Sequence, residues 1–387
     1  MKKVCIVTGT RAEYGLLKPV IDKVHNSGEL ELQLVVTGMH LSPEFGLTFH
    51  EIEEDGYPIA DKIEMLLSSD TPVGITKSMG VALIGFADFF DRNRPDIVVI
   101  LGDRYEMLVA AEAAMIARIP IAHIHGGELT EGLIDEAIRH SITKMSHLHF
   151  TTTEEYRNRV IQLGERPQTV YHVGALGVEN IKNLSLLKKE ELEKLLGFSF
   201  TATTAMVTYH PVTLEDTTAE IQFRNILDVI DSHKKITVIF TKANADTDGR
   251  IINQMIDDFV NSNHKRCVAY TSMGQLRYLS ALQFCDVVIG NSSSGIIEVP
   301  SFGIPTVNIG DRQKRRVHAA SVIDCGNGKE EIEAALTKAL SLDFKKRILN
   351  EKNPYEEEQT SERIVEIIHK ALYQGIDIKK KFFDVGA

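Results

Sequence analysis

Tryptophan is absent from this sequence, and cysteine is scarce, with four residues in a chain of 387. The four thiols, at Cys5, Cys267, Cys285 and Cys325, lie far apart, without the paired spacing of a zinc site or the density of a disulfide scaffold. The pattern therefore excludes a disulfide-stabilised secreted domain and a structural zinc module. It indicates a cytoplasmic protein, and we expect no metal and no other cofactor.

Long apolar runs and a surplus of positive charge are missing as well. No apolar stretch approaches the ~20 residues of a membrane span. The apolar run in the N-terminal MKKVCIVTGTRAEYG is too short for a signal peptide, so it predicts a buried strand. The 43 lysines and arginines are outnumbered by 54 aspartates and glutamates, which gives a net charge of −11. Such a chain repels nucleic acid, so we expect neither a nucleic-acid partner nor a membrane.

Short runs rich in valine and isoleucine recur along the chain, each followed by a turn and a helical pattern. This alternation is typical of parallel α/β sheets, and the length exceeds what one hydrophobic core usually fills. We predict two doubly wound, Rossmann-like domains, at 1–175 and 176–360, and a C-terminal helix and tail at 361–387 for which the first domain is a candidate packing surface. The predicted strands are 4–9, 31–37, 96–102, 120–125, 148–153 and 168–173 in the first domain, and 204–209, 236–241, 267–271, 287–290, 305–309 and 321–324 in the second.

Two strand ends in the first domain carry arginine. Open α/β sheets bind ligands at the carboxyl ends of their strands. In TGTRAEYG, Gly9 permits a tight turn and Arg11 starts a helix, which favours an anion; the alternative is that Arg11 pairs with a surface carboxylate. In VVILGDRYEM, Asp103 and Arg104 emerge where an apolar strand stops. Here the alternative is that Asp103 caps the helix starting at Tyr105.

The segment HIHGGELTEGLIDEAIRH, at 123–140, is dense in groups that can transfer a proton. His123 and His125 alternate along a strand, so one should point toward a cleft and the other into the packing. Glu128 follows the paired glycines, and Asp135 lies in the first turn of an amphipathic helix predicted at 134–146. Together with Asp103, these groups indicate acid–base chemistry.

Each of these helical residues also has a purely structural explanation. Asp135 and Glu136 complement the positive end of the helix dipole. Asp135 could pair with Arg139, and Glu136 with His140, because residues four apart lie on one helix face. Only the whole cluster favours catalysis.

The second domain carries a serine-rich turn in VIGNSSSGIIEVPSFGIPTVNIGDRQ. Ser292, Ser293 and Gly295 follow a strand and open a helix, a combination suited to phosphate, although a plain helix cap is the alternative. Glu298, about two turns into that helix, could reach a ribose diol, and Arg312 after the next strand supplies a cation. Two further strand ends place His210 before Pro211 and Asn244 in NADTDG.

These motifs as a set resemble the hydrolysing UDP-N-acetylglucosamine 2-epimerases of sialic and related nonulosonic acid biosynthesis. The resemblance covers nearly the whole chain and implies the glycosyltransferase-B fold, with the nucleotide sugar held between the domains. It implies that Arg11 and Arg104 reach the diphosphate, and Gly15 in the same motif as Arg11 joins the candidate binding residues. The nucleotide contacts that it implies in the second domain are His210, Asn244, Ser292, Ser293, Glu298 and Arg312.

For catalysis, the resemblance implies acidic groups at Asp103 and Asp135, and a glutamate where this sequence has His125. Sialic acid enzymes read HIEGGE there, whereas HIHGGE is similar to relatives acting on the 4-acetamido-6-deoxy sugar diacetylbacillosamine, so both substrates stay open. The implied reaction is elimination to a glycal followed by addition of water, with the acids and bases drawn from Asp103, His125, Asp135 and Glu128. A non-hydrolysing epimerase, a retaining glycosyltransferase and a silent nucleotide-sugar sensor are the alternatives. A dimer or tetramer is expected by analogy.

Overall fold

The computed structural model describes residues 1–386 of the chain, with the exception of 68, 70, 131–132, 212–218 and 244–248. The chain divides into two compact units. Unit 1 comprises Met1–Glu128, Asp135–Asn180 and Tyr355–Ala387, and unit 2 comprises Leu129–Ile134 and Ile181–Pro354. Apart from the short segment Leu129–Ile134, the chain passes from unit 1 to unit 2 after Asn180, whereas the sequence predicts this boundary at 175.

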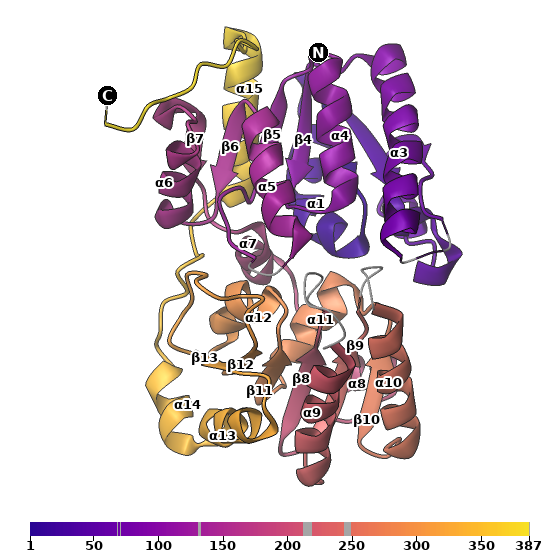
Figure 1. Cartoon of the computed structure of the whole chain (residues 1–387), viewed down its shortest axis with the longest axis vertical. Helices are drawn as coiled ribbons and strands as arrows, with labels where there is room; N and C mark the ends of the chain where they lie inside the picture. The colour runs from indigo at the N-terminus through magenta and orange to yellow at the C-terminus, as the bar shows by residue number, and fades with distance from the viewer. Residues whose placement is uncertain (68, 70, 131–132, 212–218, 244–248, 387) are drawn as a thin grey trace. The chain divides into compact units, whose positions relative to one another are not determined.

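Each unit is built on one parallel sheet. In unit 1 the strands are β1 (Lys2–Thr8), β2 (Leu30–Thr37), β3 (Ile59–Ile63), β4 (Ile97–Leu101), β5 (Ile121–Ile124), β6 (Leu148–Thr151) and β7 (Val170–His172). In unit 2 they are β8 (Thr204–Thr208), β9 (Thr237–Thr241), β10 (Cys267–Tyr270), β11 (Val287–Gly290), β12 (Thr306–Ile309) and β13 (Val322–Cys325). The strand orders are β3-β2-β1-β4-β5-β6-β7 and β10-β9-β8-β11-β12-β13 (Figure 1). The prediction of two doubly wound parallel α/β domains is confirmed.

Helices connect the strands in both units. Those that begin in or lead out of unit 1 are α1 (Arg11–His25), α2 (Phe49–Glu54), α3 (Pro72–Asn93), α4 (Tyr105–Ile116), α5 (Ile134–Met145), α6 (Glu154–Gln162), α7 (Leu176–Asn183) and α15 (Thr360–Gln374). Those of unit 2 are α8 (Lys189–Leu196), α9 (Ala219–Ser232), α10 (Gly249–Ser262), α11 (Gly274–Leu282), α12 (Ser294–Ile297), α13 (Lys329–Leu340) and α14 (Leu342–Ile348). Short 3-10 turns are η1 (Gly38–Leu41), η2 (Pro43–Phe45), η3 (Pro167–Thr169) and η4 (Val299–Phe302).

The strand β3 was not predicted from the sequence. Its five residues, IADKI, include the charged Asp61 and Lys62, so they do not form the apolar run that marks the other strands. β3 lies at the edge of the sheet, where it pairs with β2. An edge strand has one partner and one exposed flank, and charged side chains are common there.

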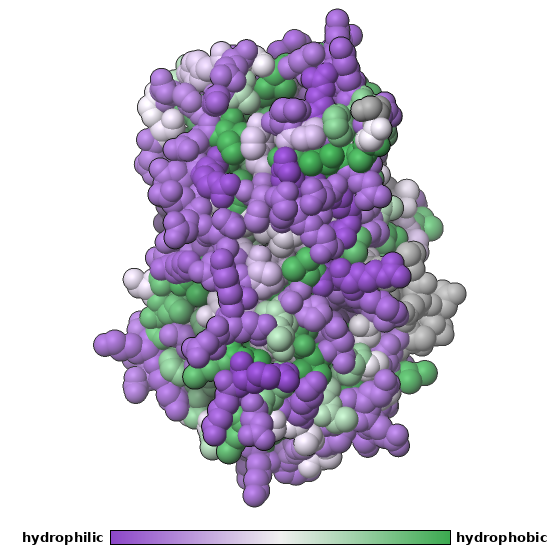
Figure 2. Space-filling view, turned by 90° about the vertical axis from the view of Figure 1, so that its left-hand side faces the viewer, coloured by the Kyte–Doolittle hydropathy of each residue, from purple (hydrophilic) through white to green (hydrophobic). Residues whose placement is uncertain are grey.

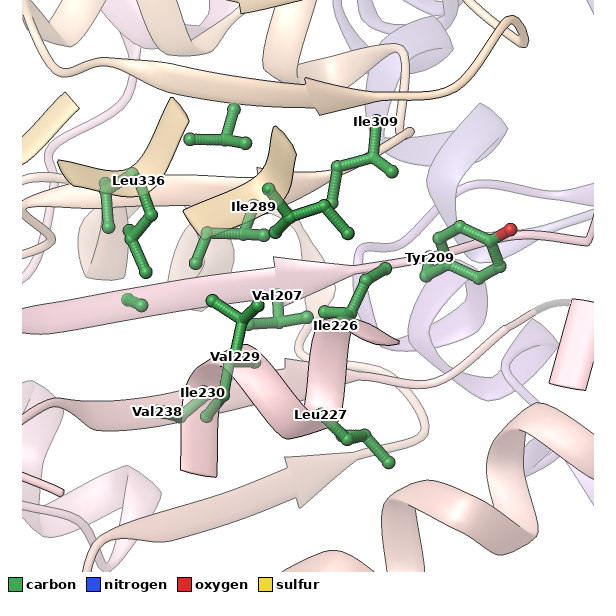
Figure 3. Close-up of a cluster of buried hydrophobic side chains, with 14 of the residues drawn as sticks. Val207, Tyr209, Ile226, Leu227, Val229, Ile230, Val238, Ile289, Ile309 and Leu336 are labelled. Carbon is green, nitrogen blue, oxygen red and sulfur yellow. The ribbon is translucent and has the colours of Figure 1, made fainter. Parts of the chain in front are cut away.

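Both faces of each sheet are covered by helices. In unit 1, α15 packs on α1, and its Ile364, Ile368 and Leu372 lie in the same buried cluster as the side chains of β1 and β4. In unit 2, Figure 3 shows Val207 of β8 and Ile289 of β11 facing helix α9 in the largest buried cluster. Burial of apolar side chains on both faces explains why these strands read as continuous apolar runs.

Helix α3 is the one described helix that is long and apolar enough to cross a membrane by length and composition. Its Ser78, Ala82, Phe86 and Phe89 are buried, and the apolar members pack with the strands of unit 1. Packing against the strands explains why this face of α3 is apolar, and no membrane is needed to account for it.

The strand orders fix where polar loops gather. In unit 1 the order reverses between β1 and β4, and in unit 2 between β8 and β11. Loops after the strands on either side of such a point diverge and leave a crevice in which ligands bind. The predicted site residues within the described part of the chain follow these four strands and their neighbours β5 and β12.

Candidate active site

Asp103 follows β4 in unit 1, where Gly102 turns the chain with a φ of +80°. Helix α4 begins at Tyr105 with Arg104 as its N-cap residue, and the helix has no side-chain cap. The alternative that Asp103 serves as a helix cap is therefore wrong. Its carboxylate instead forms an ion pair with Arg139 of α5.

Arg139 is the residue that connects the cluster. Only 3% of it is exposed, and its Nη1 donates a hydrogen bond to the main-chain oxygen of Glu128 at 2.9 Å. The same nitrogen lies 3.6 Å from Glu136 Oε2. The sequence suggested a pair with Asp135 and no functional role. Arg139 is a charged residue on the buried side of α5, next to Ile138, and this position was the sequence signal that could have indicated a functional role.

His125 and Glu128 lie beside this ion pair, at the end of β5. His125 has a φ of +67°, a conformation that costs energy in a residue with a Cβ and that clusters at functional sites. Its Nδ1 is 3.9 Å from Glu128 Oε1, which accepts a hydrogen bond from the Thr152 hydroxyl at 3.0 Å. Both side chains are almost fully buried.

His123 faces the packing, as one of the two histidines was expected to do. Its Nε2 lies 2.8 Å from the main-chain oxygen of Gly102, and its Nδ1 lies 3.1 Å from Thr143 Oγ1. Burial lowers the pKa of His123 to about 3, so the ring is neutral and supports the turn that carries Asp103.

Asp135 lies half-buried in the first turn of α5, one turn ahead of Arg139. The neighbouring Glu136 accepts from His140 at 3.1 Å, which is the structural pair that the sequence suggested. The structure therefore places Asp103, His125, Glu128 and Asp135 at two neighbouring strand ends, those of β4 and β5, and at one helix start of unit 1.

The two arginines expected at a diphosphate both have carboxylate partners within unit 1. Arg11 Nε lies 2.6 Å from Glu51 of α2, which is the alternative stated above for this residue. Arg104 donates from Nε and Nη2 to the two carboxylate oxygens of Glu106, at 3.2 Å each. Gly15 lies inside α1, and its carbonyl accepts from Asn180.

Glu13 and Glu106 are buried carboxyl groups that were not predicted. Glu13 Oε2 accepts from the main-chain nitrogens of Gly9 at 2.8 Å and Thr10 at 3.2 Å, and Thr10 in turn caps α1. Burial and the nearby charge of Glu106 raise the pKa of Glu13 to about 7. The Thr-x-x-Glu spacing of a capping box was the signal in the sequence.

In unit 2, Asn291 joins the loops after β8, β11 and β12. Its side chain accepts from the His210 nitrogen and donates to the His210 carbonyl, both at 2.8 Å. Its own carbonyl accepts from Arg312 Nη1 at 2.9 Å and from Gln313 at 2.8 Å. Asn291 is a buried residue that we did not predict as part of the site, and it brings together two predicted site residues, His210 and Arg312.

Ser292 and Ser293 lie half-buried in the loop after β11. The helix that follows, α12, is a single turn that ends at Ile297, with Glu298 as its C-cap. The expectation that Glu298 lies two turns into a helix is wrong, because a 3-10 turn begins at Val299, and Pro300 in that turn cannot continue the α-helix. Burial raises the pKa of Glu298. Asn244 falls outside the described residues.

Two doubly wound parallel sheets, each with polar loops at its switch point, define a two-domain α/β protein of the glycosyltransferase-B type. The chain belongs to the UDP-N-acetylglucosamine 2-epimerase family, whose model matches residues 22–369.

Several curated relatives match nearly full length. A GDP/UDP-N,N'-diacetylbacillosamine 2-epimerase (hydrolyzing) of Campylobacter jejuni is 43% identical over 89% of each chain. A UDP-N,N'-diacetylbacillosamine 2-epimerase (hydrolyzing) of Legionella pneumophila is 35% identical over 95% of this chain and 96% of its own. The UDP-GlcNAc 2-epimerase of Neisseria meningitidis bound to UDP-GlcNAc has the same fold, with a TM-score of 0.80 at 20% identity over 95% of this chain and 100% of its own.

Proposed function

We propose that this protein is a hydrolysing nucleotide-sugar 2-epimerase, which converts a UDP-linked 2-acetamido sugar and water into UDP and the free 2-epimer. The observation that carries the proposal is the contact set of Arg139. This one buried guanidinium holds the Asp103 carboxylate and the Glu128 main chain, so that acidic groups from two strand ends and one helix surround a single point. A protein that only bound nucleotide sugars would gain nothing from so many titratable groups placed together.

The reaction needs two proton transfers at C2, on opposite faces of the sugar. In the first step a base removes the C2 proton while the C1–O bond breaks, UDP leaves with the bonding electrons, and a C1–C2 double bond forms. In the second step the oxygen of water bonds to C1 as a base takes one proton from that water, and an acidic group returns a proton to C2 from the other face. We assign Asp103 and Asp135 to the essential transfers, with His125 and then Glu128 as supporting groups. Positioned acids and bases contribute about 10²–10⁴-fold each.

The loops of unit 2 suit the nucleotide. Asn291 fixes the main chain of His210 and one nitrogen of Arg312, and Ser292 and Ser293 present hydroxyl groups in the next loop. Arg104 and Arg11 of unit 1 are assigned to the diphosphate, where positive charge stabilises the leaving group. Arg104 is pre-oriented by two hydrogen bonds to Glu106.

We further propose that the sugar is the 4-acetamido-6-deoxy one, UDP-N,N'-diacetylbacillosamine, and that the product enters nonulosonic acid synthesis in the cytoplasm. Support comes from the names of the Campylobacter and Legionella relatives and from His125 in HIHGGE. An imidazole N–H can donate a hydrogen bond to the carbonyl oxygen of an acetamido group, whereas an ionised carboxylate can only accept one, so His125 fits a site for a 4-acetamido substituent.

The reaction is tested by incubating the protein with UDP-N,N'-diacetylbacillosamine in deuterium oxide and separating the products. We expect free UDP and a free sugar carrying deuterium at C2. A nucleotide-linked epimer would indicate a non-hydrolysing enzyme, and product without deuterium would contradict the proton transfers. Asp103→Asn should lower kcat by about 10³-fold or more, whereas the exposed Asp343→Asn in α14 should match the wild type.

Substrate choice is tested by comparing kcat/KM for UDP-N,N'-diacetylbacillosamine, its GDP analogue and UDP-GlcNAc. The wild type should prefer the 4-acetamido sugar, and His125→Glu should shift the preference toward UDP-GlcNAc by about 10-fold or more. An unchanged ratio in a folded His125→Glu variant would contradict the role of this residue, although the hydrolysing activity itself would stand.

A further inference from the structure

The short segment Leu129–Ile134 joins two groups that we assign to the reaction, Glu128 and Asp135. Both of these residues belong to unit 1, whereas the segment between them belongs to unit 2. The two ends of this short connection are thus carried by one unit, so a residue of unit 2 must hold the segment itself.

Arg316, in the loop between β12 and β13, is that residue. Its Nε donates a hydrogen bond to the Leu129 carbonyl oxygen at 2.5 Å, and its Nη2 donates to the Thr130 hydroxyl oxygen at 3.2 Å. Charged side chains usually lie on the protein surface, which is mainly hydrophilic on the face that Figure 2 shows, but Arg316 is only 5% exposed. Because a guanidinium is buried at high cost unless hydrogen bonds replace its water, these contacts are an integral part of the fold.

The turn that carries Arg316 also carries the arginine assigned to the nucleotide. Arg312 Nη1 and the Gln313 side chain both donate to the Asn291 carbonyl oxygen. The Arg316 nitrogen donates to the Gln313 carbonyl oxygen at 3.2 Å. Arg315 has a φ of +61°, a conformation that is uncommon in a residue with a Cβ and persists only where surrounding contacts enforce it. A short, constrained main chain therefore connects the nucleotide loop with the segment that Arg316 holds.

Two buried guanidiniums hold successive carbonyl groups of the main chain at Glu128. The Glu128 carbonyl accepts from Arg139 at 2.9 Å, and the Leu129 carbonyl accepts from Arg316. Arg139 also pairs with Asp103. Two fixed peptide groups in a row give the main chain one orientation, and a displacement of about 1 Å near the chemistry can cost about 100-fold in rate. Removal of Arg316 should therefore disturb acid–base groups that remain present in the chain.

We propose that Arg316 is a positioning residue for the reaction, which fixes the chain between Glu128 and Asp135 and connects it to the loop of unit 2 that binds the nucleotide. The inference rests on the proposed function, because it takes Glu128 and Asp135 to be acid–base groups. Arg316 acts on the main chain rather than on the sugar. Since Arg312 and Asn291 keep their own hydrogen bond without it, Arg316 should matter for the chemical step and little for the affinity for UDP.

The test is to measure kcat with UDP-N,N'-diacetylbacillosamine and, by calorimetric titration, the dissociation constant of UDP for the full chain. Arg316→Gln should lower kcat by about 100-fold and change the UDP dissociation constant by less than about 3-fold. Arg316→Lys, which keeps the charge and one donor for the Leu129 carbonyl, should recover about 10-fold of the lost kcat. The matched control is Lys314→Gln, which removes a positive charge from the same turn at an exposed side chain paired with Asp311; it should match the wild type.

Thr130→Val tests the same contact from its other partner. Valine keeps the shape of the side chain but removes the hydroxyl that accepts from Arg316, so kcat should fall by about 5-fold. In the Arg316→Gln background the same change should cost little more, because the hydroxyl has already lost this donor. Losses that multiply in the double variant would show that the two side chains act independently.

Circular dichroism and the melting temperature of each variant separate lost positioning from lost folding, and Arg316→Lys and Thr130→Val carry the test if Arg316→Gln does not fold. Folded variants with wild-type kcat would overturn the inference and leave the proposed function standing. A UDP affinity that falls as far as kcat would also overturn it, because Arg316 would then serve the nucleotide loop alone. A wild type without epimerase activity would instead overturn the proposed function, and this inference with it.

Discussion

Two buried carboxyl groups lie around Gly9, and they differ in their partners. Glu106 uses both of its oxygens for the guanidinium of Arg104. Glu13 accepts from the main-chain nitrogens of Gly9 and Thr10, which favours its charged form. Even so, burial and the repulsion by Glu106 dominate, so that the pKa of Glu13 rises to about 7. The folded protein therefore holds a proton on Glu13 that the unfolded chain releases at lower pH.

Glu13 thus makes the stability depend on pH in a defined direction. A carboxyl group whose pKa rises from 4.5 to about 7 on folding stabilises the folded state fully below pH 4.5, and this contribution is lost as the pH rises to about 7. The total loss is about 3 kcal/mol. Glu13→Gln keeps an oxygen acceptor for Gly9 and carries no charge, so it should remove most of this dependence.

Urea unfolding of the wild type and of Glu13→Gln, measured between pH 5 and pH 8, checks the expectation. The control is Glu31→Gln, at an exposed position of β2, which should retain the wild-type slope. Equal slopes in all three proteins would show that Glu13 does not keep its proton on folding.

The residues of the candidate site show which features can be predicted from the sequence and which cannot. Asp103, His125, Glu128 and Asp135 could be selected because each is an ionisable group next to a strand end or a helix start, and those positions can be read from the chain. Arg139 could not be assigned to Asp103, because the two lie 36 positions apart and only the pairing of β4 with β5 brings them together. The local rule that residues four apart interact pointed to Asp135 instead.

At the scale of elements, prediction worked where a strand is an apolar run between turns. The twelve predicted strands are present, the edge strands β7, β10 and β13 included, since apolar runs flanked by turns have few other conformations available. It missed β3, whose charged side chains belong to an edge strand. It also extended α12 too far, although Pro300 was visible in the sequence.

The loop between β11 and α12 depends on one glycine. Gly290 has a φ of +136°, and a Cβ on it would overlap the carbonyl oxygen of Thr208 on the neighbouring strand β8. Gly290→Ala must therefore separate β8 from β11 at the point where Asn291 holds His210. We expect a loss of about 3 kcal/mol or more in stability and the loss of UDP binding.

Calorimetric melting and UDP titration measure the two effects. Gly303→Ala is the control, because Gly303 also has a positive φ, of +65°, but an added Cβ there meets no described atom within 4 Å. It should cost about 1 kcal/mol and leave UDP binding unchanged. If Gly290→Ala behaved like Gly303→Ala, the close approach of the two strands would not matter to the nucleotide loops.

At the scale of the whole molecule, unit 1 is assembled from distant parts of the chain. Its core contains Ile364, Ile368 and Leu372 of α15, although the segment Ile181–Pro354 between α7 and α15 belongs to unit 2. Contacts of such sequence separation form late in folding. Unit 1 therefore completes its core only after the chain of unit 2 has been made.

The segment after α15 also contacts unit 1, through Lys380. The Lys380 ammonium lies 2.8 Å from Glu165 Oε2 and donates to the main-chain oxygens of Lys144 and Ser146. Glu165 is 2% exposed, and it also accepts from His149 at 3.0 Å and from Lys144 at 2.6 Å. These positive and hydrogen-bonding partners lower the pKa of Glu165 to about 2, against the opposing effect of burial.

Lys380→Met should therefore destabilise unit 1 selectively. It removes one of the partners of a buried carboxylate but leaves Lys144 and His149, so we expect a cost of about 2 kcal/mol. Native-state hydrogen exchange should show faster opening of the amides of β6 and α5, whereas those of β8 and β11 in unit 2 should exchange at wild-type rates. Lys381→Met, at the exposed neighbouring position, should change neither set. Acceleration of both sets by Lys380→Met would mean that the two units open together, and the tail would then stabilise the whole chain rather than the unit it contacts.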